Sequence, residues 1–159
     1  MHRILVAEDN RINQVVVAGA LKKLGYLADI VDDGGAAVLA CAAEDYDAVL
    51  MDVMMPGVDG YQATGYIRDH ERSMGLAPVP IIGLSARAMA GDSQTALDAG
   101  MNDYLTKPVR TLALEAVLER WITSRAAIEV TGENDSVMSV SVGSEAPGSG
   151  PAREGPKLD

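Results

Sequence analysis

Short apolar runs alternate with helical patterns along most of this chain. Five runs have the length and composition of buried strands, and they cover residues 4–7, 27–31, 47–52, 81–85 and 102–106. Apolar residues with helical spacing follow each run. Because a helix lies in every connection between strands, the strands should be parallel and their connections right-handed. The pattern therefore predicts an α/β fold, a doubly wound five-stranded parallel sheet with helices on both faces.

The spacing of apolar residues also predicts which side of each helix is buried. The first helix should end at Gly25, and the second should begin at the turn formed by residues 32–34. A third helix is expected over about 61–71 and a fourth over 89–99. The predicted core faces comprise Val16, Val17, Ala20, Leu21 and Leu24 in the first helix, Val38, Leu39 and Ala42 in the second, and Leu114, Val117, Leu118, Trp121 and Ile122 in the last.

The character of the chain changes from about Arg125. Residues 125–159 contain no aromatic residue, are rich in Gly, Pro, Ser and Glu, and have no helical period. A segment of this composition buries too little apolar surface to offset the entropy lost on folding. We therefore predict one domain over residues 1–124 and a disordered C-terminal tail or linker over residues 125–159.

Composition and charge exclude several classes of function. The formal net charge of −10 argues against a nucleic-acid surface, which needs clustered Lys and Arg. Cys41 is the single cysteine and cannot form an internal disulfide, and the N-terminus lacks the apolar stretch of a signal peptide. No run is apolar and long enough to span a bilayer, so no membrane contact is expected. These features predict a cytoplasmic location.

A single carboxylate interrupts the third apolar run. Asp52 follows the apolar residues 49–51, and Pro56 ends the run shortly afterwards. In open α/β sheets the chemistry is found at the carboxyl ends of the strands, so an acid there is a candidate functional residue. Taken alone, Asp52 could equally be an ordinary strand-end residue that caps a turn. Its interpretation depends on the residues that end the other strands.

The other strands bring further polar groups to the same rim of the sheet. The first run ends in Glu8 and Asp9, the fourth in Ser85 and the fifth in Lys107. Two carboxylates about 5 Å apart repel by roughly 3 kcal/mol at an effective dielectric near 20, so three acids need cations to stay ionised. Lys107 supplies one positive charge, and an all-oxygen set favours Mg²⁺ as the other cation. No cluster of Cys and His suits zinc.

Motifs at these strand ends resemble the receiver domain of two-component signalling. They are Glu8-Asp9-Asn10, residues 51–56 with Asp59-Gly60, Leu84-Ser85-Ala86, and residues 103–108. Each motif alone is weak, whereas their order at successive strand ends is specific. The similarity covers Arg3 to about Ser124 and implies a flavodoxin-like (βα)5 fold. Asn13-Gln14, residues 88–92 and 99–104, and Trp121 are most similar to receivers of hybrid histidine kinases.

The resemblance implies roles in phosphoryl transfer and switching. Asp52 would accept the phosphoryl group as an acyl phosphate, and Lys107 would pair with a phosphoryl oxygen. Ser85 would hydrogen-bond another oxygen, and its movement would open space into which Tyr104 rotates. Pro108 would follow a cis peptide bond. Taken singly, Ser85 could cap a turn, Tyr104 could be an ordinary half-buried aromatic and Lys107 a solvated side chain.

The resemblance also implies a metal and partners. Mg²⁺ would be bound by Asp9 and Asp52 directly, by Glu8 mainly through water, and by the backbone carbonyl of Met54. The partner would be a histidine kinase or a histidine phosphotransfer domain that carries a phosphohistidine. A homodimer through the face formed by the last two helices and the fifth strand is a further possibility. The chain would be a signalling module that promotes its own phosphorylation and dephosphorylation, within a parent such as a hybrid histidine kinase.

Two alternatives stay open at this point. The first is a Mg²⁺-dependent phosphatase-like enzyme on a similar sheet, with a strand-end Asp as nucleophile. Similar phosphatases have an Asp-x-Asp pattern in which the second acid protonates the leaving group. Met54 occupies the position of that second acid here. The second is a pseudo-receiver that acts only as a binding module. The complete set of three acids, Ser85 and Lys107 argues against it.

Overall fold

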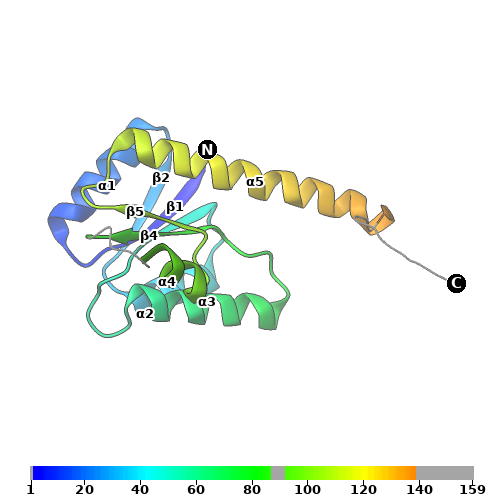
Figure 1. Ribbon diagram of the computed structural model, residues 1–159, viewed down its shortest axis with the longest axis horizontal. Coiled ribbons are helices and arrows are strands. Elements are labelled where there is room, and N and C mark those ends of the chain that lie inside the picture. The colour runs from blue at the N-terminus through cyan, green and yellow to red at the C-terminus, as the bar shows by residue number, and fades with distance from the viewer. Residues whose placement is uncertain (1, 87–91, 139–159) are drawn as a thin grey trace, which may run out of the picture. The chain divides into compact units, whose positions relative to one another are not determined.

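The computed structural model describes residues 2–86 and 92–138, with side chains over residues 2–86 and 94–125. Its sheet has five parallel strands in the order β2-β1-β3-β4-β5 (Figure 1). The strands are β1 (Arg3–Ala7), β2 (Leu27–Val31), β3 (Ala48–Asp52), β4 (Ile81–Ser85) and β5 (Asp103–Thr106). The predicted doubly wound, five-stranded parallel sheet is therefore confirmed.

Helices cover both faces of the sheet (Figure 1). They are α1 (Arg11–Lys23), α2 (Gly34–Ala43), α3 (Gly60–Met74), α4 (Asp92–Ala99) and α5 (Thr111–Met138). Because successive side chains of a strand point to opposite faces, Ile4, Val6 and Leu50 pack with residues of α1 and α5. Leu5 and Met51 pack on the other face with residues of α2, α3 and α4. The carboxyl end of every strand is left at one rim, between these two helical layers.

The buried face of α1 differs in part from the prediction. Val17 and Leu21 are buried as expected, whereas Val16 is 48% exposed. The face toward the sheet instead takes Gln14, three residues before Val17. Because residues 15–17 are three consecutive valines, the apolar pattern of α1 fits more than one rotation of the helix about its axis. The pattern alone therefore could not identify the buried side of α1.

The predicted face of α2 is wrong at two positions. Leu39 is 72% exposed and Ala42 is also exposed, while Ala37 is buried. Gly34 sets this rotation, because a Cβ atom there would lie 2.3 Å from the carbonyl oxygen of Val58. Nearly every residue of α2 is apolar, so periodicity could not identify the side that is buried.

The last helix is longer than expected. Leu114, Leu118 and Ile122 are buried as predicted, but α5 continues to Met138, past the boundary expected at about residue 124. A helix that is already nucleated needs only propagation to continue, and residues 125–130 include good helix formers. The domain boundary at residue 124 and the disordered tail stay predictions, and residues 139–159 lie outside the described part.

The helices differ from the sequence predictions at other ends as well. Helix α3 begins one residue earlier and extends past the expected end at about residue 71, closing at Gly75, which has a positive φ of 67°. Helix α4 is described from Asp92, and residues 89–91 of the predicted helix lie outside the described part. Among the described residues, no helix combines the length and apolarity needed to cross a membrane.

Candidate functional site

The strand register brings two of the predicted acids side by side. Val6 pairs with Leu50, and Ala7 pairs with Met51, so Glu8 and Asp52 are the next residues across the β1–β3 pair. Neighbouring strands lie about 4.8 Å apart, which sets the spacing of the two backbones. Glu8 is fully buried and Asp52 is 3% exposed. Two carboxylates are therefore held together at the end of the central strands.

Lys107 neutralises part of this charge. Its Nζ lies 2.9 Å from Asp52 Oδ2 and 2.9 Å from Glu8 Oε1. Its backbone N–H donates to the carbonyl of Ser85 at 2.7 Å, which ties the exit of β5 to the end of β4. Burial lowers the pKa of Lys107, but the two carboxylates outweigh that effect and raise it overall. The ammonium therefore stays charged between the two acids.

Asp9 completes an acidic cluster. One carboxylate oxygen from each of Glu8, Asp9 and Asp52 can be chosen so that all three lie within 4.8 Å of one another. Asp9 is exposed, whereas the other two acids are buried, so the cluster opens to solvent on the side of Asp9. Backbone N–H groups hold the buried acids: Asn10 donates to Glu8 Oε2 at 3.1 Å, and Met54 donates to Asp52 Oδ1 at 3.2 Å.

The electrostatics of the cluster favour a second cation. Burial, with a smaller contribution from nearby Glu8, raises the pKa of Asp52 to about 6, against the opposing effects of Lys107 and the Met54 N–H. Burial also acts to raise the pKa of Glu8, but Lys107 and the Asn10 N–H outweigh it, so that pKa is lowered. Glu8 Oε1 is buried and accepts no well-aligned hydrogen bond from the described residues. An oxygen-only donor set with surplus negative charge fits a hard divalent ion.

The loop after Asp52 is packed tightly against the strand it leaves. A Cβ atom at Gly60 would lie 2.3 Å from the carbonyl oxygen of Asp52. The N–H of Gly60 donates to the carbonyl of Val53 at 3.1 Å, and Asp59 and Gln62 form a capping box at the start of α3. This packing fixes the backbone at Met54, whose side chain is 72% exposed. The Lys107–Pro108 bond is cis, as the resemblance implied.

Ser85 and Tyr104 lie on the two strands next to β3. Ser85 ends β4 and is buried, and its register partner on β5 is Thr106. Tyr104 is the partner of Gly83 and packs, partly buried, with the residues of α3 and α4. Because residues two apart in a strand share a face, Ser85 lies on the same face of the sheet as Gly83 and Tyr104. The two predicted switch residues are therefore diagonal neighbours.

One contact at the site was missed from the sequence. Gln14, on the buried face of α1, donates to the backbone carbonyl of Glu8. The available signal was a polar residue within the apolar pattern of a helix that follows the acidic motif. Its partner could not be inferred, because that partner is a backbone atom.

The comparisons with known proteins agree with this geometry. Residues 4–119 match the family described as the response regulator receiver domain. The sensor histidine kinase GacS of Pseudomonas protegens is 41% identical over 119 residues, which are 75% of this chain and 13% of that protein. The chain therefore spans only a small part of the length of such curated relatives.

Solved structures of receiver domains have the same fold. The receiver domain of the sensor histidine kinase PA1611 from Pseudomonas aeruginosa, crystallised with a magnesium ion in its active-site cleft, is 46% identical with a TM-score of 0.69. That match covers 77% of this chain and 98% of the other. The receiver domain of Ssk1 from Saccharomyces cerevisiae, crystallised with the histidine phosphotransfer protein Ypd1, is 33% identical with a TM-score of 0.74, covering 79% and 91%.

Fold, acidic cluster and sequence similarity lead to one assignment. The five-stranded order, the buried acids with their lysine, and the match over residues 4–119 agree with one another. From them we conclude that this chain belongs to the response regulator receiver domain family of two-component signalling.

Proposed function

We propose that this chain is a phosphoacceptor module of a phosphorelay and that Asp52 takes the phosphoryl group. The observation that carries the proposal is the contact of Lys107 Nζ with both Asp52 Oδ2 and Glu8 Oε1, at 2.9 Å in each case. A carboxylate nucleophile, an ammonium and a further acid meet there from three strands. Phosphoryl transfer depends chiefly on such positioning and on charge stabilisation.

In the proposed step, a carboxylate oxygen of Asp52 bonds to phosphorus while the bond from phosphorus to the donor's imidazole nitrogen breaks. The electron pair of the broken bond stays on the imidazole, and the product is an acyl phosphate. Lys107 would then pair with a phosphoryl oxygen. A bound Mg²⁺ would be held directly by Asp9, Asp52 and the carbonyl of Met54, and by Glu8 mainly through water, and it would supply further neutralisation of the phosphoryl charge.

The proposed signal is a change in the surface around β5. Ser85 would donate its hydroxyl to a phosphoryl oxygen, and Tyr104 would turn into the space that this movement leaves. Their diagonal placement on one face of the sheet supports the coupling. Amide NMR shifts of α4, β5 and the first turns of α5 should change on loading with beryllofluoride and Mg²⁺. Unchanged shifts over these elements would contradict the switch.

Intact-mass measurement tests the acceptor directly. The wild type should gain the mass of one phosphoryl group in Mg²⁺ with excess acetyl phosphate, and Asp52→Asn should gain none. Asp45→Asn removes an exposed carboxylate outside the site and should behave as the wild type. If Asp52→Asn gains the same mass, or if no protein gains any, the proposed acceptor is wrong.

The site favours a signalling module over a phosphatase-like enzyme. A phosphatase would need an acid two residues after the nucleophile, and that position holds Met54, whose thioether has no proton to give. Added phosphomonoesters should therefore be turned over no faster by the wild type than by Asp52→Asn.

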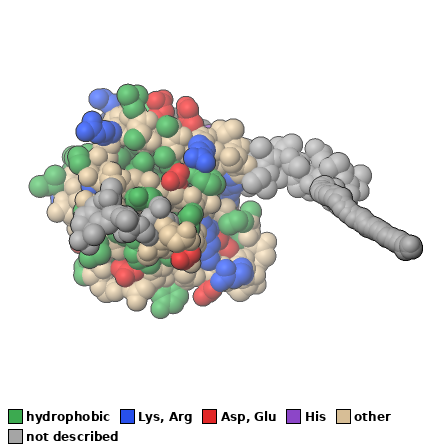
Figure 2. Space-filling model, viewed as in Figure 1, with side chains coloured by type: hydrophobic (Ala, Val, Ile, Leu, Met, Phe, Trp, Pro, Cys, Tyr) green, Lys and Arg blue, Asp and Glu red, His purple; other side chains and the backbone are tan. Residues whose placement is uncertain are grey.

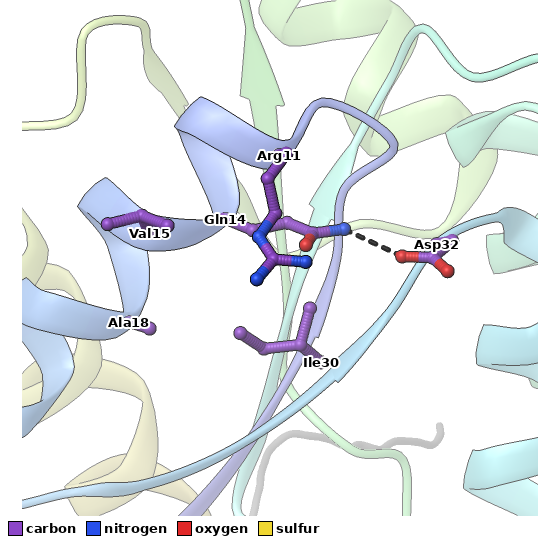
Figure 3. Close-up of a pocket in the computed structure, with 6 residues that line it drawn as sticks. All are labelled: Arg11, Gln14, Val15, Ala18, Ile30 and Asp32. Carbon is purple, nitrogen blue, oxygen red and sulfur yellow. Dashed lines mark hydrogen bonds between the residues drawn. The ribbon is translucent and has the colours of Figure 1, made fainter.

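We further propose that the phosphohistidine donor docks on α1. This helix begins directly after Asp9 and Asn10, and it exposes Ile12 and Val15, which are 73% and 61% exposed. Hydrophobic side chains lie at the surface on the side of the molecule where α1 is drawn (Figure 2). Beside them is a pocket of about 440 Å³ between α1 and β2, lined by Arg11, Gln14, Val15, Ala18, Ile30 and Asp32 (Figure 3). An apolar helix surface on the donor would cover this patch and bring its histidine to the acidic cluster.

Two phosphodonors separate docking from chemistry. Ile12→Asp should slow phosphorylation by a phosphorylated histidine phosphotransfer protein about 10-fold or more, because a charge enters an apolar contact. The same variant should react with acetyl phosphate at the wild-type rate. Leu39→Asp is the matched control, because it places the same charge at an exposed apolar residue of α2 instead of α1. Equal rates for both variants with the protein donor would contradict docking on α1.

The predicted homodimer stays a proposal. Leu97 of α4 and Leu112 of α5 are 53% and 79% exposed, which supports an apolar contact on this face. Light scattering with and without beryllofluoride should detect the molar mass of a dimer, and Leu112→Asp should abolish that dimer. The molar mass of a monomer under both conditions would rule out the homodimer. The cytoplasmic location likewise stays a prediction.

A further inference from the structure

Gln14 is a buried amide outside the acceptor and metal-binding sets. Its Nε2 donates to the backbone carbonyl of Glu8 at 2.6 Å and to Asp32 Oδ1 at 2.7 Å. Gln14 is 8% exposed. Figure 3 shows its amide nitrogen directed from α1 toward Asp32, which follows the end of β2. The side chain therefore joins the loop that carries the acids to the neighbouring edge strand.

The carbonyl that Gln14 holds belongs to the peptide group between Glu8 and Asp9. Because this group is planar, fixing its oxygen fixes the direction in which the chain enters Asp9. The N–H of Glu8 is held separately by the carbonyl of Val31 at 3.1 Å. Asp9 is exposed, so packing contributes little to the position of its carboxylate. The orientation of this peptide is therefore a main determinant of where Asp9 lies relative to the other acids.

We infer that Gln14 is a positioning residue for the divalent metal, acting through the Glu8–Asp9 peptide, and that Asp32 holds the Gln14 amide in the required orientation. An amide nitrogen has two hydrogens, so Asp32 can take one while the Glu8 carbonyl takes the other. The inference rests on the proposed Mg²⁺ site. Loss of an outer contact of this kind typically weakens metal affinity by about 10–100-fold.

A purely structural role would give a different result. Gln14→Leu leaves the Glu8 carbonyl without its donor, so both roles predict a less stable protein. Only the positioning role predicts weaker Mg²⁺ binding by molecules that remain folded. Val17→Ala is the matched control, because it leaves a cavity on the same buried face of α1 without touching Glu8.

The experiment is an amide NMR titration with MgCl₂ of wild type, Gln14→Leu and Val17→Ala, at a temperature where all three are folded. Gln14→Leu should bind Mg²⁺ about 10–100-fold more weakly than wild type, and Val17→Ala within about 2-fold of it. Equal affinity of Gln14→Leu and Val17→Ala would overturn the inference and leave the proposed function intact. No Mg²⁺ binding by the wild type would overturn both.

A second pair of variants keeps the test valid if Gln14→Leu does not fold. Asp32 is exposed, and Asp32→Asn and Asp32→Ala remove the same charge. Only the asparagine retains an oxygen that can accept from Gln14. Asp32→Ala should therefore bind Mg²⁺ at least about 3-fold more weakly than Asp32→Asn, a smaller loss than that of the direct contact. Identical affinities of the two variants would overturn the role of Asp32.

Discussion

Asp52→Asn should make the metal-free protein more stable at neutral pH. Asp52 is 3% exposed, and burial raises its pKa to about 6, with Lys107 opposing the rise and Glu8 adding to it. An ionised Asp52 is therefore less favourable in the folded protein than in the unfolded chain. Asparagine has nearly the same shape and no charge, so it removes this cost.

The size of the effect follows from the pKa. A rise from 3.8 to about 6 corresponds to about 3 kcal/mol of lost stability once Asp52 is ionised in both states. The cluster opens to solvent beside Asp9, which reduces the effect, and we expect a gain of about 2 kcal/mol for Asp52→Asn at pH 7.5. For a domain of this size the melting temperature should rise by roughly 5–10 °C.

The sign of the pH dependence is specific. A pKa raised in the folded state means that the folded protein binds the proton more tightly, so wild-type stability falls as pH rises from about 4 through 6. The advantage of Asp52→Asn should therefore be largest above pH 7 and should shrink toward pH 4. Mg²⁺ at about 100 times its dissociation constant should raise the free energy of unfolding of the wild type by about 2.7 kcal/mol. This gain should narrow the stability difference between the wild type and Asp52→Asn.

Urea unfolding in EDTA between pH 4 and pH 7.5 measures the effect. Asp45→Asn is the control, because it removes one exposed carboxylate and changes the net charge equally. An Asp52→Asn variant no more stable than Asp45→Asn at pH 7.5 would refute the predicted cost of burying the ionised carboxylate. A stability difference between the two variants that stays constant down to pH 4 would refute it as well.

Three further predictions concern single residues. Lys107→Ala should slow phosphorylation by acetyl phosphate about 100-fold in a stopped-flow assay, and a rate near that of the wild type would contradict its role. Arg68→Ala should cost about 3 kcal/mol in urea unfolding, because Arg68 Nη1 lies 2.9 Å from buried Glu71 Oε1; a loss under 1 kcal/mol would contradict this. Gly60→Ala should lower the free energy of unfolding by about 2–3 kcal/mol, since its Cβ would lie 2.3 Å from the Asp52 carbonyl oxygen. A variant as stable as the wild type in urea would contradict this prediction.

Much of the site could be predicted because strand ends are readable from local sequence. Residues 81–85 and 27–31 were predicted with their observed bounds, since apolar strand runs between turn residues leave little choice. In a parallel sheet every strand ends at the same rim, so Asp52 and Lys107 were expected together although they are far apart in sequence. The structure adds the distance of 2.9 Å between Lys107 Nζ and Asp52 Oδ2.

The buried sides of the helices were less predictable than the strand ends. Leu39 satisfies the apolar pattern of α2 but is 72% exposed, because the close approach of Gly34 to the carbonyl of Val58 sets the rotation of that helix. This approach joins the start of α2 to a loop that is distant in sequence. A periodic pattern carries no information about such a contact.

The sequence by itself determined the order of strands and helices and the chemical types of residue at each strand end, because both depend on local apolar runs and on the rule that parallel strands share a rim. Only the tertiary structure decided which atoms meet there. The bridge of Lys107 between Glu8 and Asp52, and the hold of Gln14 on the Glu8 carbonyl, depend on register, helix rotation and backbone orientation. These are set by packing between segments that are remote in the chain.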